Sequence, residues 1–152
     1  MKSAVRLFCL ALLLMPFFCG CTIRPNREIP AGYINKEEHI DLQGGQDFTD
    51  YCKYYYPNDD VSVIHNNYRT VDEADIEDIQ GYFSDFARWM ETEGREDDYD
   101  FDSACITPGD YVRIRTKEGT PIGDSYYQKY DDYTLWFFDT ESCTLYYIHT
   151  NI

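Results

Sequence analysis

The feature that most constrains the fold is a change in hydrophobic spacing near Gly94. Before it, residues 70–94 carry apolar side chains three or four positions apart, which places them on one stripe of an α-helix. The stripe consists of Ile76, Ile79, Phe83, Phe86 and Met90. Thr70 and Glu73 have the spacing of a capping box, and Gly94 is suited to end the helix. We therefore expect a long amphipathic helix over residues 70–94, with its stripe facing the core.

After Gly94 the pattern is typical of short β-strands. Aromatic and β-branched residues gather in five segments that turn residues separate. These segments are residues 99–106, 111–116, 125–130, 133–139 and 143–150. The turns favour pairing of consecutive strands, so this half of the chain is predicted to form an antiparallel β-meander. Before the long helix, residues 47–56 follow helical spacing, although the three tyrosines at 54–56 would also suit a strand; we favour a helix.

The last two predicted strands give a register that divides the sheet into two sides. With a two-residue loop at 140–141, Trp136 lies opposite Leu145 and Phe138 opposite Cys143. We expect this side to pack on the helix. The predicted fold is thus an α+β domain with one long amphipathic helix on an antiparallel meander, a layout similar to that of the cystatin and NTF2-like groups.

The N-terminus carries the pattern of an export signal. Lys2 and Arg6 precede a continuous apolar run, residues 7–18, which is too short to span a bilayer as a helix. At its end, the sequence Phe-Cys-Gly-Cys that finishes at Cys21 resembles the lipobox of bacterial lipoproteins, in which a cysteine after small residues is acylated and becomes the new N-terminus. The resemblance implies a signal peptide at residues 1–20, lipid on Cys21, and a protein anchored to the cell membrane or outer membrane.

The remaining chain divides into a tether and one domain. Residues 21–32 contain two prolines and a glycine without apolar periodicity, which is typical of an extended tether, and residues 33–152 have the length of a single domain. The formal net charge of the whole chain is −15. Such an acidic chain repels phosphates, which argues against nucleic acid as a partner, and attracts cationic partners or divalent cations. Solubility alone would also explain the charge.

Three cysteines remain if the signal is removed and Cys21 carries lipid, namely Cys52, Cys105 and Cys143. Outside the cytoplasm we expect a disulfide between Cys105 and Cys143, because both lie in the predicted sheet region; three buried free thiols are the equal alternative. The cysteines and histidines lack the close paired spacing of a zinc site. No sequence of a phosphate-binding loop, a serine hydrolase or a zinc protease is present, so the sequence identifies no catalytic residue.

An acidic run near residue 100 suggests a calcium loop. Asp98, Asp100 and Asp102 occupy positions one, three and five of an EF-hand-like sequence. Ser103 stands where the loop needs glycine, and Gly109 stands where it needs a bidentate glutamate. The aspartates also alternate with aromatic residues, as in a strand with one buried and one solvated face. We favour the strand, with a weak Ca²⁺ site as the alternative and no other cofactor expected.

Tyrosine is unusually frequent, with 15 of 152 residues. Adjacent tyrosines in a strand point to opposite faces, so each tyrosine pair in the meander presents one ring away from the predicted helix side. Tyr127, Tyr146 and Tyr133 are the expected binding residues of that second side, because tyrosine offers contact area with a polar tip. Residues 48–56, another subunit or a ligand would otherwise have to cover it.

Two classes of function follow from these patterns. The favoured one is a non-enzymatic binding or inhibitor module at the cell envelope that engages a protein, peptide or glycan through its tyrosine-rich sheet. The alternative is a small exported hydrolase that uses paired carboxylates, although the sequence does not locate such a pair among 28 acidic residues. A deep pocket with shifted pKa values would favour the enzyme, and a flat aromatic face would favour binding.

Overall fold

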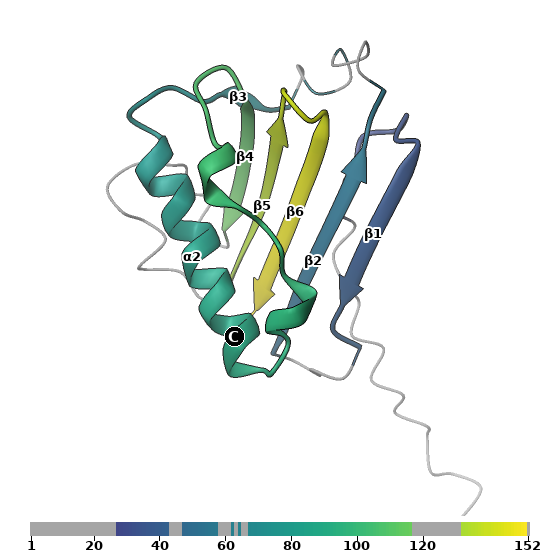
Figure 1. Cartoon of the computed structure of the whole chain (residues 1–152), viewed down its shortest axis with the longest axis vertical. Helices are drawn as coiled ribbons and strands as arrows, with labels where there is room; N and C mark the ends of the chain where they lie inside the picture. The colour runs from purple at the N-terminus through teal and green to yellow at the C-terminus, as the bar shows by residue number, and fades with distance from the viewer. Residues whose placement is uncertain are drawn as a thin grey trace, which may run out of the picture.

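The computed structural model describes residues 27–42, 47–57, 62, 64, 67–116 and 132–151. In this part of the chain, six strands form one antiparallel sheet in the order β1-β2-β6-β5-β4-β3, and an α-helix lies on one of its faces (Figure 1). The strands are β1 (Asn35–Ile40), β2 (Phe48–Tyr55), β3 (Arg69–Thr70), β4 (Tyr111–Thr116), β5 (Asp132–Asp139) and β6 (Thr144–Asn151). The helices are α2 (Ile76–Thr92) and two 3-10 helices, η2 (Glu96–Asp98) and η3 (Ser103–Cys105). None of the described helices is both long and apolar enough to cross a membrane.

The predicted layout, one long helix on a meander, is wrong. The α-helix has 17 residues and begins after Asp75, while Thr70 belongs to β3. Residues 47–56, predicted as a helix, form the interior strand β2 between β1 and β6. That strand is buried on both faces, and Thr49, Asp50 and Lys53 interrupt its aromatic residues, so its sequence has no period of two to distinguish it from a helix. The expected similarity to the layout of the cystatin and NTF2-like groups depended on the meander and is therefore not supported.

Two further predicted strands have different outcomes. Residues 99–106 are not a strand; they run back along α2 on the same face of the sheet and include η3 (Figure 1). Tyr99 and Phe101 in this segment pack against the core between α2 and the sheet, which explains their alternation with aspartates without any strand pairing. The predicted strand at 125–130 lies outside the described residues.

The apolar stripe of α2 is confirmed. Ile79, Phe83, Phe86 and Met90 are at most 1% exposed, and Ile76 is partly buried against the same core. Gly94 ends the helix as expected: its φ of +69° is a left-handed conformation, and the N–H of the following Arg95 donates to the carbonyl oxygen of Met90 at 2.8 Å. The helix length therefore follows from its stripe, not from the predicted capping box.

The register of the last hairpin differs from the prediction by two residues. Trp136 pairs with Tyr147 and Phe138 pairs with Leu145. The connection has four residues instead of two, because the Asp139 carboxylate accepts hydrogen bonds from the N–H of Glu141 and the hydroxyl of Ser142, which stabilises a longer turn. A shift of two leaves every side chain on its predicted face.

The side of the sheet that the helix covers was predicted wrongly. Leu135, Phe137 and Ile148 pack against α2, whereas Trp136 and Phe138 point to the other side. Both faces of β5 and β6 are apolar, so alternation alone does not indicate which one receives the helix. We call the two sides the helix face and the outer face.

The outer face is covered by the chain itself. Its buried side chains are Cys52, Tyr54, Trp136, Phe138, Leu145 and Tyr147, packed with Tyr56, Ile64 and Tyr68. Residues 27–30, predicted as part of the tether, lie on this face. The Trp136 Nε1–H donates to the carbonyl oxygen of Arg27 at 2.8 Å, and the Tyr56 hydroxyl donates to that of Pro30 at 2.7 Å. We call residues 27–30 the strap.

Candidate functional site

The tyrosines predicted to form a binding surface do not come together on an open face in the described part of the chain. Tyr133 is 1% exposed, and its hydroxyl donates to the carbonyl oxygen of Tyr82 at 2.8 Å. Tyr146 is partly buried on the helix face, where its ring meets that of Phe101 edge-on at 4.8 Å between centroids. Tyr127 lies outside the described residues. Tyr133 and Tyr146 are therefore part of the packing beneath α2.

The three cysteines in the described part of the chain are free thiols that lie in different environments. Cys105 packs against the helix-face core, whereas Cys143 and Cys52 lie in the outer-face core, so the expected Cys105–Cys143 pair is on opposite faces. Burial raises the pKa of the Cys52 thiol to about 11 and that of the Cys105 thiol to about 12. A thiol with so high a pKa is protonated at neutral pH and is a poor nucleophile, so neither residue is suited to catalysis.

The three aspartates of the predicted calcium loop have separate partners. Asp98 contacts His39 and Arg95, and Asp100 accepts hydrogen bonds from Tyr51 and Lys53. Asp102 instead accepts from the N–H of Ala104 and caps η3. Among the described residues, no group of three or more histidine, cysteine or acidic side chains is arranged to hold a metal ion. The three carboxylates of the acidic run therefore take part in separate contacts within the protein.

An open cleft of about 750 Å³ lies where β1 ends, beside the segment that follows α2. Residues 38–42 and Asp47 supply one wall, and Glu93, Arg95 and Asp98, before and within η2, supply the other. Its lining residues are Glu38, His39, Ile40, Asp41, Leu42, Asp47, Glu93, Arg95 and Asp98. Five of these nine side chains are carboxylates, against one guanidinium, so the cleft has a formal charge of 5 − 1, or four negative charges.

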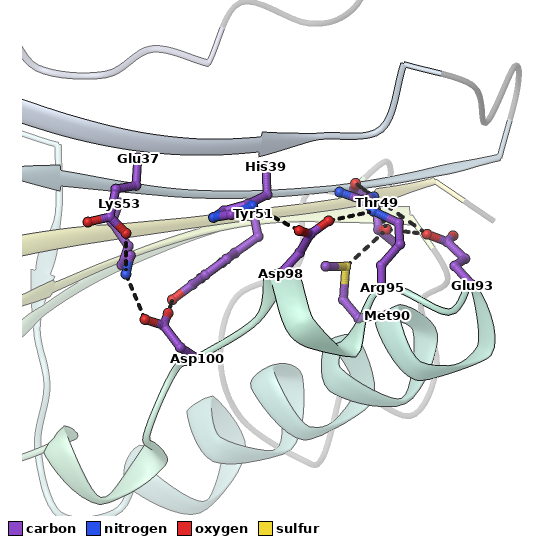
Figure 2. A network of polar contacts seen from close by, with 10 residues as sticks. All are labelled: Glu37, His39, Thr49, Tyr51, Lys53, Met90, Glu93, Arg95, Asp98 and Asp100. Atoms are coloured by element: carbon purple, nitrogen blue, oxygen red, sulfur yellow. Dashed lines mark hydrogen bonds and ion pairs between the residues drawn. The ribbon is translucent and has the colours of Figure 1, made fainter.

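Arg95 fixes the geometry of the wall beyond α2 (Figure 2). Its Nη1 donates to the carbonyl oxygen of Thr49 at 2.7 Å and lies 3.0 Å from the Thr49 hydroxyl, and its Nε donates to Asp98 at 3.2 Å. Thr49 is fully buried in β2, and its hydroxyl donates to Glu93 at 2.5 Å. These contacts tie the end of α2 to the sheet and satisfy the single guanidinium of the cleft within the protein.

A histidine and an aspartate meet at the cleft. His39 Nδ1 lies 3.1 Å from an Asp98 oxygen, and the imidazole stacks on the Tyr51 ring with 6.2 Å between centroids (Figure 2). The His39 and Asp98 side chains are 35% and 41% exposed. Because Arg95 holds Asp98 from the opposite side, the carboxylate is oriented toward the imidazole. The pair is therefore fixed in position and still open to solvent.

Next to the cleft, Lys53 holds two carboxylates in their ionised form. Its Nζ lies 2.5 Å from Glu37 and 2.7 Å from Asp100, which also accepts a hydrogen bond from Tyr51 at 2.8 Å. The Lys53 hydrogen bond is the main cause of the lowered pKa of Glu37. For Asp100, burial acts to raise the pKa, but the hydrogen bonds from Lys53 and Tyr51 outweigh it and the pKa is lowered.

Glu38, on the other side of β1, also has a lowered pKa. Burial opposes ionisation of this carboxyl, yet hydrogen bonds from Lys36 and Tyr54 and the charge of Arg27 lower its pKa. A general acid at neutral pH needs a carboxyl whose pKa is raised. The carboxyls with lowered pKa around this edge of the sheet are therefore held ionised by Lys53, Lys36 and Arg27, and they are not suited to donate protons.

Sequence reasoning did not identify His39 or Arg95 as site residues. His39 and Asp98 are 59 residues apart, and they meet only because β1 is a strand of the sheet and the chain turns back after Gly94. Asp98 had been assigned to a strand or a calcium loop. The strong acidity of the chain was the only sequence signal for a cation-binding site, and it did not indicate where in the chain the site lies.

Comparison of the chain with models of protein families, with curated proteins and with solved structures finds no match. The function is therefore argued from the geometry of the cleft. The arrangement provides an anionic, solvent-open concavity with an oriented imidazole, and no serine, threonine or cysteine stands among the described residues that line it.

Proposed function

We propose that this chain is an exported, lipid-anchored binding module that takes a basic peptide segment of a protein partner in the acidic cleft beside β1. The observation that carries the proposal is the composition of the cleft, whose five carboxylates outnumber its single guanidinium, although one of them, Glu38, is already paired with Arg27 and Lys36. A concave surface with walls of one charge concentrates the field and raises the local concentration of opposite charges. Lysine or arginine side chains are the cations that fit this description.

The position of the cleft favours a peptide over a small cation. β1 is an edge strand of the described sheet, and its first residues, Asn35, Lys36 and Glu37, are exposed. An extended peptide adds to such an edge by backbone hydrogen bonds. Its path along β1 leads to the cleft, where Leu42 is 85% exposed and offers an apolar contact. The charged side chains of β1 also oppose pairing between two copies of this acidic edge.

Titration calorimetry with a hexalysine peptide tests the cleft. The protein is the chain from residue 21 onward with Cys21→Ser, so that no lipid is attached. We expect the double variant Asp47→Asn, Glu93→Gln to bind roughly tenfold more weakly, which is about 1.4 kcal/mol. The matched control, Glu73→Gln with Glu77→Gln, removes the same charge from exposed positions before and at the start of α2 and should change the affinity less than about twofold. Equal losses in the two double variants would show that only net charge matters, and the cleft would be rejected.

The lipid anchor is proposed from residues 1–21, which lie outside the described residues. Two acyl chains on one cysteine are enough for stable membrane attachment, and no spanning helix is needed. Metabolic labelling with a fatty-acid probe should mark the native chain and not Cys21→Ala. Equal labelling of both chains, or labelling of neither, would reject the anchor.

A small exported hydrolase remains a second candidate because of the His39–Asp98 pair. An imidazole oriented by a carboxylate is the base of many hydrolases, and here it could activate a water molecule. The measurement is turnover of a panel of peptide, ester and glycoside substrates by the native chain and by His39→Gln. Turnover that disappears in His39→Gln, while persisting hexalysine binding shows that the variant is folded, would support a hydrolase that uses His39. Absence of turnover in the native chain would remove this candidate.

A further inference from the structure

The second charged site of the molecule lies on the outer face, at the edge opposite β1. Arg113 and Arg115 are two residues apart on β4 and therefore share a face, and Arg113 is paired with Trp136 of β5. Their guanidinium carbons lie 4.7 and 5.5 Å from the centroid of the Trp136 ring. The ring orients the two cations side by side, which is the arrangement that receives one carboxylate with two hydrogen bonds.

The carboxylate in this site comes from the strap. One Glu28 oxygen accepts from Arg113 Nη2 at 2.6 Å and the other from Arg115 Nη2 at 2.8 Å, and these two hydrogen bonds lower the pKa of Glu28. The backbone of Glu28 has φ +51°, a left-handed conformation that a residue with a Cβ adopts unfavourably. The local backbone therefore does not place the carboxylate there by itself; the contacts with the sheet hold it.

Every residue of the strap is recognised by a different part of the outer face. Arg27 donates to Glu38 of β1 and to the Tyr54 hydroxyl of β2, and its carbonyl oxygen accepts from Trp136. Ile29 packs against the outer-face core, and the carbonyl oxygen of Pro30 accepts from the Tyr56 hydroxyl. Side-chain sites for successive residues, together with hydrogen bonds to the main chain, are the features of a peptide-binding surface.

We propose that the outer face is a peptide-binding site which the strap fills in its own chain, and which also takes the strap of a second copy. The ligand is a short segment with arginine, glutamate, an apolar residue and proline in succession. Arg113 and Arg115 recognise its carboxylate. The proposed ligand is the strap of a second copy of this chain, because it has the same sequence as the strap that occupies this surface in the structure. This inference shares Glu38 with the acidic cleft, because Arg27 of the strap pairs with that carboxylate, but it is argued from the contacts of Glu28 with Arg113 and Arg115 and not from the cleft.

The strap of the same chain competes with any strap added from outside. It is present at a high effective concentration, so the native chain should bind a second strap weakly. Loosening the internal strap by Arg27→Gln with Glu28→Gln should raise the apparent affinity for an added strap at least tenfold. The Arg115→Gln change in the same background should abolish that gain, because one hydrogen bond to the carboxylate and one cation over Trp136 are lost.

The test uses the full chain with Cys21→Ser and a fluorescent peptide of the sequence of residues 26–33, followed by fluorescence anisotropy. We expect tighter binding to the loosened variant than to the native chain, weaker binding of the same peptide with glutamine in place of its glutamate, and no gain with Arg115→Gln. Absence of binding to a folded loosened variant at millimolar peptide would overturn the proposal, as would binding that does not depend on Arg115. If the loosened variant does not fold, Glu28→Gln alone replaces it under the same criteria.

Discussion

The two faces of the sheet are covered by different means. On the helix face, α2 contributes a regular stripe of large side chains, and the contacts are those of a hydrophobic core. On the outer face, the strap together with Tyr56, Ile64 and Tyr68 covers a second hydrophobic cluster, and the strap is held in addition by side-chain hydrogen bonds and ion pairs. Apolar burial is strong and independent of pH, whereas exposed ion pairs are weak and depend on protonation and salt. The helix face should therefore carry most of the stability, and the outer face should open first.

The largest expected effect is on the helix face. Phe83 is 1% exposed, and its ring stacks on Phe101 at 3.7 Å between centroids and meets Phe137 edge-on at 6.1 Å. Phe83→Ala removes this ring from a packed core and should lower the free energy of unfolding by about 3 to 5 kcal/mol in urea denaturation. Ser84→Ala, at an exposed position on the same helix, is the control and should change it by less than about 0.5 kcal/mol. A Phe83→Ala value below about 1 kcal/mol would contradict the proposed difference between the faces.

A smaller effect is expected from the outer face. Trp136→Phe keeps an aromatic ring but removes the Nε1–H that donates to the carbonyl oxygen of Arg27. We expect a loss of about 1 to 3 kcal/mol, because a hydrogen bond is lost and a partly buried acceptor is left without this donor. Trypsin should also cleave after Arg27 faster than in the native chain, since the strap is held less firmly. A loss as large as that of Phe83→Ala with unchanged cleavage would show that the strap is as firmly held as the helix.

The same difference explains how much of the fold the sequence predicts. The stripe of α2 and the strands at 111–116, 133–139 and 143–150 follow from periodicity, because each of these elements has a pattern that its own residues determine. The strand β2 does not, because its aromatic residues also fit helical spacing and its pairing partners β1 and β6 are set by the whole sheet. Likewise, tertiary packing decides which face of β5 meets the helix, because both faces of this strand are apolar.

The candidate site was predictable only in its charge. The acidity of the chain indicated a cationic partner, and the cleft agrees with that sign. The positions of His39 and Arg95 depend on a strand and a turn that are far apart in sequence. The strap was predicted as part of an extended tether at residues 21–32, because that stretch has two prolines, a glycine and no apolar periodicity. Its contacts with Trp136 and Arg113 lie more than eighty residues away in the sequence, where no local pattern indicates them.

The smallest expected effect is a pH-dependent release of the strap. It should affect the outer face and not the helix face, because a carboxylate helps to hold the strap. Glu28 has a pKa below its ordinary value of 4.5 because Arg115 and Arg113 donate hydrogen bonds to it. A carboxyl whose pKa is lowered on folding adds stability that is complete above about pH 4.5 and is lost as the pH falls through the lower pKa of the folded state. The contribution is small because the carboxylate is 36% exposed and is screened by solvent.

The indole N–H resonances of the two tryptophans provide the measurement. The Trp136 signal should shift as the pH is lowered from 7 through 4.5 toward 2, because protonation of Glu28 loosens the strap whose carbonyl oxygen Trp136 binds. Trp89, which belongs to α2 and not to the outer face, is the internal reference and should not follow that shift. In Glu28→Gln, the Trp136 signal should lie near its low-pH position already at pH 7, since the charge that holds the strap is absent at every pH. An identical titration of Trp136 in the native chain and in Glu28→Gln would show that Glu28 does not hold the strap, which would then be held by the contacts of Arg27, Ile29 and Pro30.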